Sequence, residues 1–543
     1  MNKEKGTEER PLPIGRDQIK AATELLRQYR EGRASMEERI VDEAGWYDRR
    51  QTASSVENGE SATSVWLFSS ICNRHADAMD NYPTAVCLPR EPSDAEDARM
   101  LSDILPVILE KSNFEQTYSE NEWFKIKYGM AVYGVFWDNT LENGLGDIRL
   151  SKIHPLNLFW EPGITDIQDS RNVFVIALME DEEIRRQYPH YRPEPQYDGM
   201  GLTDYRMVSW PNQTEEGNKT VVVDWYYKTT TPDGRTLLHY CKFAKGEVLF
   251  ASENHEVFAE RGWYEHGQYP IELDVLYPME GSPAGFGMIA VGRNPQTYID
   301  RIDGNLMHYL DEATHVRYLA KKSAGINMDA FNDSTQKIVE VEGDIDEERF
   351  RQMTLNPLDR VYMDLRNMKV DELKETTGNR DISQGSTLHG VTAASAILAL
   401  QEAGQKGSRD AIATSYRMYV RLMRQIIELI RQFYTEERCF RISGKGDGSR
   451  DYRFVSYSNK SLVDQVTGID AQGRFTYRRP VFDIDVKASR MTPYEQEKQN
   501  EIMKELFTMG VFAPERAREA EIMLEGMQFS GIHQVRSMVK NGI

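Results

Sequence analysis

The chain has 543 residues, of which 66 are Lys or Arg and 86 are Asp or Glu, so its formal net charge is −20. At about 150 residues per domain, this length predicts three or four structural units with a sizeable core. The hydrophobic fraction of 40% excludes a disordered chain. The longest apolar run, Val173–Met179, is far shorter than the ~18 residues that a membrane helix needs. An acidic chain is also not an ordinary sequence-reading DNA-binding protein, which would be basic.

The cysteines and the first residues indicate the compartment. Four cysteines without CxxC spacing exclude a disulfide-built fold and favour a reducing cytosol. Residues 1–18 are polar and contain no apolar core of a secretory signal, so we expect them to form a mobile arm.

The first part of the chain predicts helices followed by strands. Helical spacing of apolar residues predicts four helices, over 19–29, 65–79, 100–108 and 114–128, with a loop over 49–63 and a stop near Pro83. Alternating or continuous apolar runs then predict strands over 132–138, 147–153, 173–179, 220–227, 237–243 and 247–251, with a short helix over 181–188. These elements together predict a mixed α+β unit.

The middle of the chain predicts a helix and a small module. Residues 295–324 have a thin apolar stripe among mixed charges, which suits packing against similar helices better than burial in a globule. Residues 325–370 predict a small α/β module, with strands at Gln336–Val341 and Arg360–Asp364 and a helix at Glu347–Met353. The segment 370–382 is a poor helix by pattern.

A polar loop over 376–390 precedes the strongest helical pattern of the chain. Residues 393–434 would form a helix of roughly 60 Å if it continued through the weak point at Gly404–Ser408. Strands are expected at Arg453–Tyr457 and Val481–Val486, and helices at 494–508, 514–524 and 532–540.

A search for catalytic motifs finds little. The chain has no P-loop, HExxH or GxSxG motif, and the GxG at Gly285–Gly287 lacks the third glycine of a dinucleotide site. The acidic clusters Glu340–Glu348 and Asp94–Asp97 could serve as metal ligands in a nucleic-acid-processing enzyme, but no basic cluster accompanies them. Solvated acidic surface is the favoured interpretation. We therefore expect no enzyme activity, no metal and no cofactor.

Four segments, in their order and spacing, resemble tailed-bacteriophage portal proteins, the head-to-tail connector rings. The first two segments are Lys127–Asp138 (KYGMAVYGVFWD) and Gly146–Pro162 (GDIRLSKIHPLNLFWEP). The third is His266–Pro270 (HGQYP), followed by Ile271–Tyr277, Gly281–Gly287 and the helix opening at Gln296, and the fourth is Gly385–Gln405. The resemblance covers most of residues 50–540. Another virion connector or minor capsid protein is the alternative, and a metal-dependent nucleic-acid-processing enzyme is the less favoured one.

The resemblance implies an α+β portal-type fold. Carried onto this chain, the wing would be 1–285 and 408–490, the first stem helix 286–324 and the clip 325–364. The stem return and tunnel loop would be 365–407, and a short helical crown 491–543. The long wing-crossing helix would be the one predicted after the polar loop.

The resemblance also implies the partners. The chain would form a homo-oligomeric ring, usually a dodecamer, at one capsid vertex in the virion, assembled in the host cytoplasm. Double-stranded DNA would pass through it without sequence-specific binding. The terminase large subunit, a head-completion or adaptor protein, and the major capsid and scaffolding proteins would dock on it, with no membrane involved.

Two sets of residues are candidates for the DNA channel. The uncharged, glycine-containing tunnel loop would comprise Ser383, Gln384, Gly385, Ser386, Thr387, Leu388, His389 and Gly390. A basic ring could come from Arg317, Lys321 and Lys322, near the expected end of the first stem helix. The alternatives are an ordinary surface loop and ordinary surface charge at a helix end.

Overall fold

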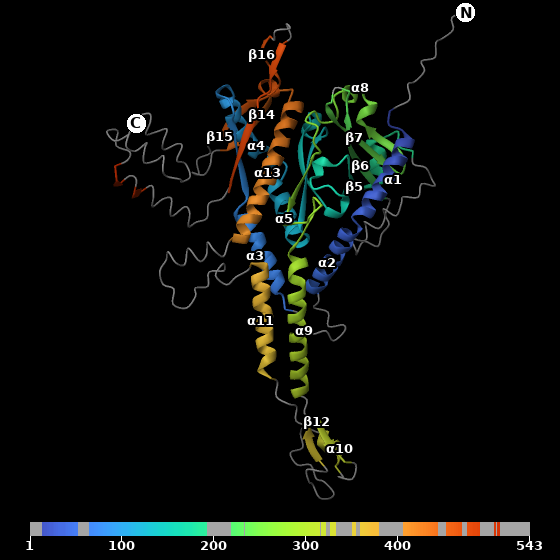
Figure 1. The fold of residues 1–543 in the computed structure, drawn as a ribbon, viewed down its shortest axis with the longest axis vertical. Helices are drawn as coiled ribbons and strands as arrows, with labels where there is room; N and C mark the ends of the chain where they lie inside the picture. The colour runs from blue at the N-terminus through green and yellow to red at the C-terminus, as the bar shows by residue number, and fades with distance from the viewer. Residues whose placement is uncertain are drawn as a thin grey trace, which may run out of the picture. The chain divides into compact units, whose positions relative to one another are not determined.

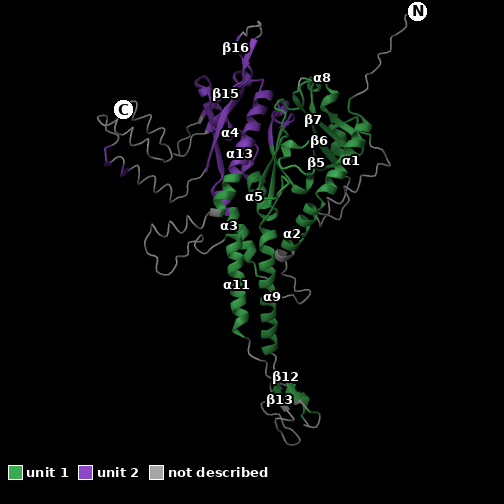
Figure 2. Cartoon of the chain, in the orientation of Figure 1, with its two compact units in different colours: residues 1–75, 116–136, 150–414 green, residues 76–115, 137–149, 415–543 purple. Residues whose placement is uncertain are grey.

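The computed structural model describes residues 13–52, 64–192, 219–232, 234–314, 317–321, 326–332, 350–353, 359–378, 406–443, 452–469, 475–488, 504–505 and 508–510. The chain forms two compact units (Figure 2). The first comprises residues 1–75, 116–136 and 150–414, and the second 76–115, 137–149 and 415–543. Both contain helices and strands, which confirms the α+β class.

An antiparallel sheet and two helices dominate the first unit (Figure 1). The sheet has the order β4-β5-β6-β7-β8, with strands at Leu158–Trp160, Asn172–Glu180, Lys219–Thr230, Thr236–Ala244 and Glu247–Ala251. Apolar side chains of α1 (Arg16–Gly32) and α2 (Ala34–Thr52) share one core with the sheet residues Phe159, Phe174 and Trp225. The short helices α6 (Asp181–Gln187) and α8 (Glu256–Ala259) follow β5 and β8 in the chain.

Arg33, at the turn between α1 and α2, fixes these helices to the loop before β4. It is 6% exposed, and its guanidinium donates to the carbonyls of Pro155, Leu156 and Leu158. The same group lies 4.0 Å from the ring centroid of Phe159. A buried guanidinium needs such partners, and this one side chain donates to three carbonyls before and at the start of β4.

A second group of elements comprises two helices and a three-stranded sheet. Helices α3 (Trp66–Asp80) and α5 (Phe114–Tyr128) precede a sheet of order β3-β2-β9, with strands at Asp147–Ile153, Met130–Asp138 and Ile271–Val275. Gly129, between α5 and β2, has φ +93, and a Cβ there would lie 2.1 Å from the Phe286 carbonyl carbon. Only glycine permits this backbone and this approach.

The chain then forms β10 (Tyr277–Pro278), β11 (Gly285–Phe286), α9 (Met288–Thr314), β12 (Arg317–Ala320), α10 (Met328–Asn332), β13 (Phe350–Met353) and α11 (Arg360–Thr377). Strands β12 and β13 pair antiparallel from Arg317 with Met353 to Ala320 with Phe350. Helix α11 ends at Thr377, and the next residue, Gly378, has a φ of +71, which suits a helix C-cap.

Four expectations for this region are wrong. The helix predicted over 295–324 begins at Met288 and ends at Thr314, because Arg317–Ala320 pair as a strand. Arg360–Asp364 is the first part of helix α11 rather than a strand, and the poor helix pattern after Val370 is helical up to Thr377. Phe350–Met353 is a strand rather than part of a helix.

The second unit joins segments that lie far apart in the sequence. Strand β1 (Pro83–Pro89) pairs antiparallel with β18 (Phe482–Ala488), and β14 (Arg438–Ser443) pairs with β15 (Tyr452–Tyr457). The Oγ of Ser102, on α4 (Ala95–Lys111), accepts a hydrogen bond of 2.8 Å from the Cys87 amide of β1. The second part of α13 (Lys406–Phe433) also belongs to this unit, and Ile426 and Ile430 on it are fully buried.

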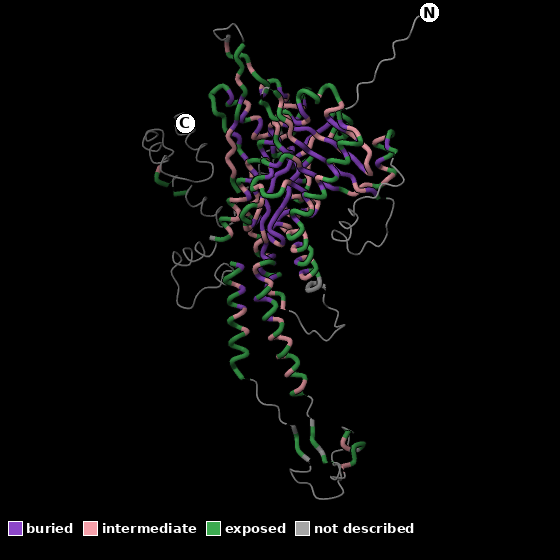
Figure 3. Tube along the Cα trace, turned by 45° about the vertical axis from the view of Figure 1, so that its right-hand side comes forward, coloured by how far each residue is buried: buried purple, intermediate pink, exposed green. Residues whose placement is uncertain are grey.

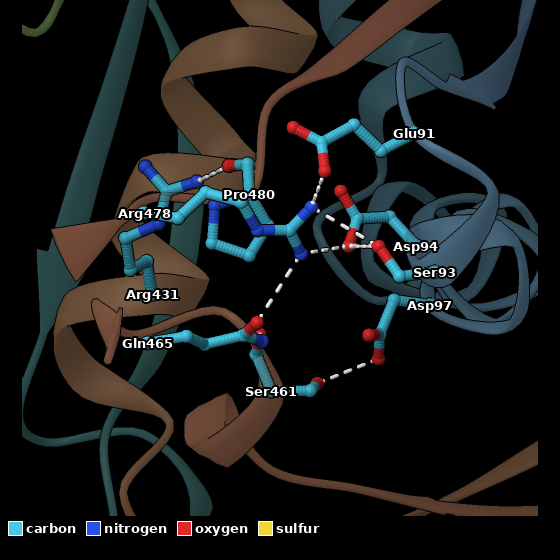
Figure 4. Close-up of polar contacts among 9 residues, drawn as sticks. All are labelled: Glu91, Ser93, Asp94, Asp97, Arg431, Ser461, Gln465, Arg478 and Pro480. Carbon is cyan, nitrogen blue, oxygen red and sulfur yellow. Dashed lines mark hydrogen bonds and ion pairs between the residues drawn. The ribbon is translucent and has the colours of Figure 1, made fainter. Parts of the chain in front are cut away.

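An arginine anchors another hairpin of this unit, β16 (Gln465–Ile469) with β17 (Phe475–Arg478) (Figure 4). Arg478 is hydrogen-bonded to Glu91, Ser93 and Asp94 before α4, and its Nη2 lies 3.2 Å from Gln465 Oε1. Asp94 is 3% exposed. Because a buried carboxylate needs a partner, this contact fixes the hairpin to the start of α4.

Several predictions fall outside the described residues: the strand at 336–341, the polar loop 379–390, the opening of the long helix at 393–405, and the helices at 514–524 and 532–540. Of the helix predicted at 494–508, only residues 504–505 and 508 are described, and they are helical. The described part of the long helix, α13, begins at Lys406, and Gly407 and Ser408 are helical.

Candidate functional site

The first half of α9 is fixed to α3 by a buried amide. Gln296 is 1% exposed; its Oε1 accepts from the Leu67 amide at 3.0 Å, and its Nε2 donates to Ser64 O at 3.0 Å and Asp300 Oδ1 at 2.9 Å. Gly292 permits the close approach, since a Cβ there would lie 2.6 Å from Leu67 Cδ1. This end of α9 is therefore held by specific contacts.

Helices α9 and α11 lie side by side (Figures 1 and 3). Ile299 of α9 and Val370 and Leu373 of α11 form a small buried cluster. Arg366 of α11 forms a two-pronged ion pair with Asp303 of α9, with Nη2 at 3.2 Å from Oδ2. The hydrogen bonds that Arg366 donates to the Asp303 carboxylate raise the pKa of Arg366, so the guanidinium stays charged.

Beyond this cluster, the residues of both helices are mostly exposed or half-buried (Figure 3). No residue of α9 after Ile299 is buried. The exposed apolar set comprises Tyr298, Met307 and Leu310 on α9 and Val361, Tyr362, Met363, Leu365 and Met368 on α11. We call these eight residues the exposed helix face. Such a number of exposed apolar side chains on two neighbouring helices is typical of a protein contact surface.

A buried charge cluster lies where the chain turns toward α9. Lys125 of α5 donates to Asp274 Oδ2 of β9 at 2.9 Å and to Glu122 Oε1 at 3.3 Å, and all three side chains are at most 2% exposed. Burial raises the pKa of Glu122 to about 7, against the opposing effect of the Lys125 ammonium. The two carboxylates raise the pKa of Lys125 despite its burial. The ionic contact ties α5 to the strand that leads through β10 and β11 into α9.

The comparison with protein families decides the identity. The sequence model of the family described as Phage P22-like portal protein matches residues 76–273 and 279–543. This chain belongs to the P22-like phage portal family. The resemblance inferred from the four sequence segments is confirmed. A search of curated proteins found no match.

As a portal protein, this chain is a structural component of a phage head rather than a member of an enzyme family. The described residues contain no group of three or more His, Cys, Asp or Glu side chains that could hold a metal ion. None of the described helices has the length and apolar composition needed to span a bilayer.

One residue set of this portal protein has the composition of a catalytic triad. The Nδ1 of His239 lies 3.3 Å from Ser252 Oγ, and its Nε2 lies 3.6 Å from Glu253 Oε1. Ser252 is fully buried, and its Oγ accepts the Tyr240 amide hydrogen at 3.0 Å. Nucleophilic catalysis needs a hydroxyl that a substrate can reach, so this set stabilises the β7–β8 region instead.

The predicted channel residues are described only in part. The tunnel-loop residues 383–390 and Lys322 lie outside the described residues. Arg317 begins β12 and Lys321 directly follows it, exposed. Both therefore come after the end of α9 rather than on it. The sequence analysis did not predict the buried charge cluster of Glu122, Lys125 and Asp274. The opposite charges of Glu122 and Lys125, three residues apart in a helix rich in aromatic residues, could have indicated it.

Proposed function

We propose that this chain forms the portal ring of a phage capsid, with about twelve copies arranged around a channel for double-stranded DNA. The ring lies at one vertex of the capsid, and DNA passes through it during packaging and ejection. Membership of the portal family supports a ring that contacts capsid and DNA. The chain contributes shape and charge rather than bond-making chemistry.

We assign the described elements to the subdivisions that the resemblance implies. Helices α9 and α11 form the stem, and β12, α10 and β13 belong to the clip. The five-stranded sheet with α1 and α2, and the elements after Lys406, form the wing, which α13 crosses. Residues 383–390 form the tunnel loop and 491–543 the crown. Because α11 begins at Arg360, the returning stem helix starts a few residues before the expected 365.

The observation that carries the proposal is the exposed helix face. A ring of identical chains needs a heterologous contact that closes by rotation. Met368, Tyr362 and Leu310 are 55%, 54% and 53% exposed in the single chain. Complete burial of an exposed large apolar side chain contributes about 1.5–3 kcal/mol, so burying the exposed half of each of these contributes about half of that. Packing beside the helices of a neighbouring copy would provide this burial.

The charge suits a channel through which DNA slides. Twelve copies at −20 each carry about −240 in total, a field that repels the polyanion from acidic walls. Contacts from Lys or Arg to phosphates release counterions and bind tightly, so a fully basic lining would slow passage. The uncharged loop 383–390 and a basic ring from Arg317, Lys321 and Lys322 are the proposed exceptions along this path.

The ring would also serve as a docking platform. The terminase large subunit would bind during packaging and a head-completion or adaptor protein afterwards, while the major capsid and scaffolding proteins would surround it. The ring would assemble in the host cytoplasm and remain in the virion. The chain needs no cofactor for this role.

The test is the assembly state of the purified full chain. Light scattering and negative-stain images should show an annulus of about twelve subunits. Leu310→Glu and Met368→Glu should each shift the chain toward monomers, because they place a charge in the proposed contact. Val257→Glu, at an apolar position on α8 that is also more than half exposed, is the matched control and should assemble normally. A wild-type chain that stays monomeric at all concentrations contradicts the proposal.

The loop proposal has its own test. Removal of residues 383–390 should leave the annulus intact and reduce the retention of packaged DNA. Unchanged retention would remove the loop from the channel.

A further inference from the structure

One face of α3 contacts both the end of α11 and the beginning of α13. The hydroxyl oxygens of Ser70 on α3 and Thr377 in the last turn of α11 lie 3.2 Å apart and are hydrogen-bonded. Arg74 follows Ser70 by four residues and therefore lies on the same face of α3. Its Nη1 donates to Ser408 Oγ, in the first turn of α13, at 2.5 Å. Helix α3 thus holds one helix where it ends and the other where it begins.

Two glycines lie against the guanidinium of Arg74. A Cβ on Gly378, the residue after α11, would lie 3.7 Å from Arg74 Nη2, and a Cβ on Gly407 of α13 would lie 3.5 Å from the same nitrogen. One nitrogen is therefore close to the backbone of both helix ends. A cation is favourable beside the C-terminal end of a helix, where carbonyl groups carry partial negative charge. The planar fork of arginine offers several donors and can contact two elements at once.

The segment 379–405, which connects these two helices, starts and finishes at the same side chain. Ser383 follows Gly378 by five residues, and five residues of extended chain span at most about 18 Å. The position of the end of α11 therefore limits where the proposed tunnel loop 383–390 begins.

We propose that Arg74 is a positioning residue of the DNA channel. It joins the end of α11 to the beginning of α13 and so fixes the point from which the loop 383–390 starts. This inference rests on the proposed ring and on the proposed role of that loop. Arg74 acts through Gly378 and Ser408, so its loss leaves the loop sequence intact and lets the two helix ends separate.

The first measurement compares amide hydrogen exchange in Arg74→Gln with that in Arg99→Gln, a control that removes an exposed arginine from α4. Local opening of each helix end sets its exchange rate. Because a hydrogen bond from a charged donor is lost, residues 374–378 and 408–412 should exchange at least about tenfold faster in Arg74→Gln. Helix α5 should keep its wild-type rate, and Arg99→Gln should match the wild type throughout.

Two results of this measurement overturn the inference. Wild-type exchange at both helix ends of Arg74→Gln shows that the arginine does not hold them. An equal acceleration in α5 shows a general loss of stability rather than a local one.

A second variant removes the hydrogen bond and keeps the guanidinium. Ser408→Ala should accelerate exchange at 408–412. The double variant Arg74→Gln/Ser408→Ala should exchange no faster there than Arg74→Gln alone, because both changes break the same contact. Fully additive effects would show that the two residues act independently and contradict the inference.

The last measurement is the retention of packaged DNA by particles that carry each variant. Arg74→Gln should form wild-type rings and lose retention to the level found after removal of 383–390, whereas Arg99→Gln should retain DNA normally. Normal retention with Arg74→Gln, when removal of the loop impairs it, overturns the inference and leaves the proposed function in place. Failure of Arg74→Gln to form rings assigns the arginine to assembly and also overturns it. Wild-type chains without rings overturn the proposed function itself, and the role of Arg74 in a channel with it.

Discussion

Glu122 makes the stability of the first unit depend on pH. Its pKa is raised in the folded chain from an ordinary value of 4.5 to about 7, first because of burial and also because of the nearby Asp274 carboxylate. Below pH 4.5 both the folded and the unfolded chain hold the proton. As the pH rises from 4.5 to 7, the unfolded chain loses it first, so the free energy of unfolding falls. One pKa unit corresponds to about 1.4 kcal/mol, so the full loss above pH 7 is about 3 kcal/mol.

The variant Glu122→Gln resembles the protonated side chain at every pH and leaves the Lys125–Asp274 pair in place. Urea unfolding followed by tryptophan fluorescence should therefore show a variant that is up to about 3 kcal/mol more stable than the wild type at pH 8. The difference should decrease steadily toward pH 5. Glu182→Gln, at an exposed position on α6, should show no such change. A difference between Glu122→Gln and the wild type that is the same at pH 5 and pH 8 refutes the reasoning.

Two further predictions concern packing. Gly129→Ala should cost at least about 3 kcal/mol, because the new Cβ overlaps Phe286 and the backbone has a positive φ, whereas Gly163→Ala, with φ +82 in open space, should cost only about 1–2 kcal/mol. If Gly129→Ala and Gly163→Ala lower the thermal stability equally, the backbone at Phe286 moves away from the new Cβ at position 129. Leu373→Ala should cost about 2–5 kcal/mol, since the side chain is 1% exposed, while Met368→Ala, at a 55% exposed position, should leave monomer unfolding nearly unchanged. Chemical unfolding of dilute monomer checks the pair, and similar losses would contradict the assignment of Met368 to an outer surface.

The local periodicity of apolar residues was sufficient to predict an element where that element packs into the core of the same chain. The predicted helix over 114–128 has the observed bounds of α5, since Gly129 ends it and its aromatic side chains are largely buried. Strands β5 and β7 were also confirmed within one or two residues. In both cases the pattern of apolar residues reflects burial within one chain.

The pairing of strands that lie far apart in the sequence could not be predicted from such local patterns. Strand β1 begins at Pro83, which indicated only a helix stop, and it pairs with β18 about 400 residues later in the chain. The strands β16 and β17 were missed because Val466, Phe475 and Tyr477 are exposed, so no alternation between core and solvent marks them. The ionic contact of Arg478 with Asp94 gives this hairpin its position, and no local pattern encodes such a contact.

The prediction of a strand at Arg360–Asp364, which is the start of α11, was wrong for a different reason. That reason bears on the function. Val361, Tyr362 and Met363 are consecutive apolar residues, which is why the segment resembles a strand. In the single chain all three are exposed around the helix, so no burial within one copy explains their composition. The helix periodicity becomes regular only near Val370 and Leu373, where α9 covers it. When other copies of the chain cover part of a helix, its apolar residues need not follow the pattern of burial within a single chain. The apolar residues in the first part of α11 follow no such pattern, as expected for a helix that packs against neighbouring copies.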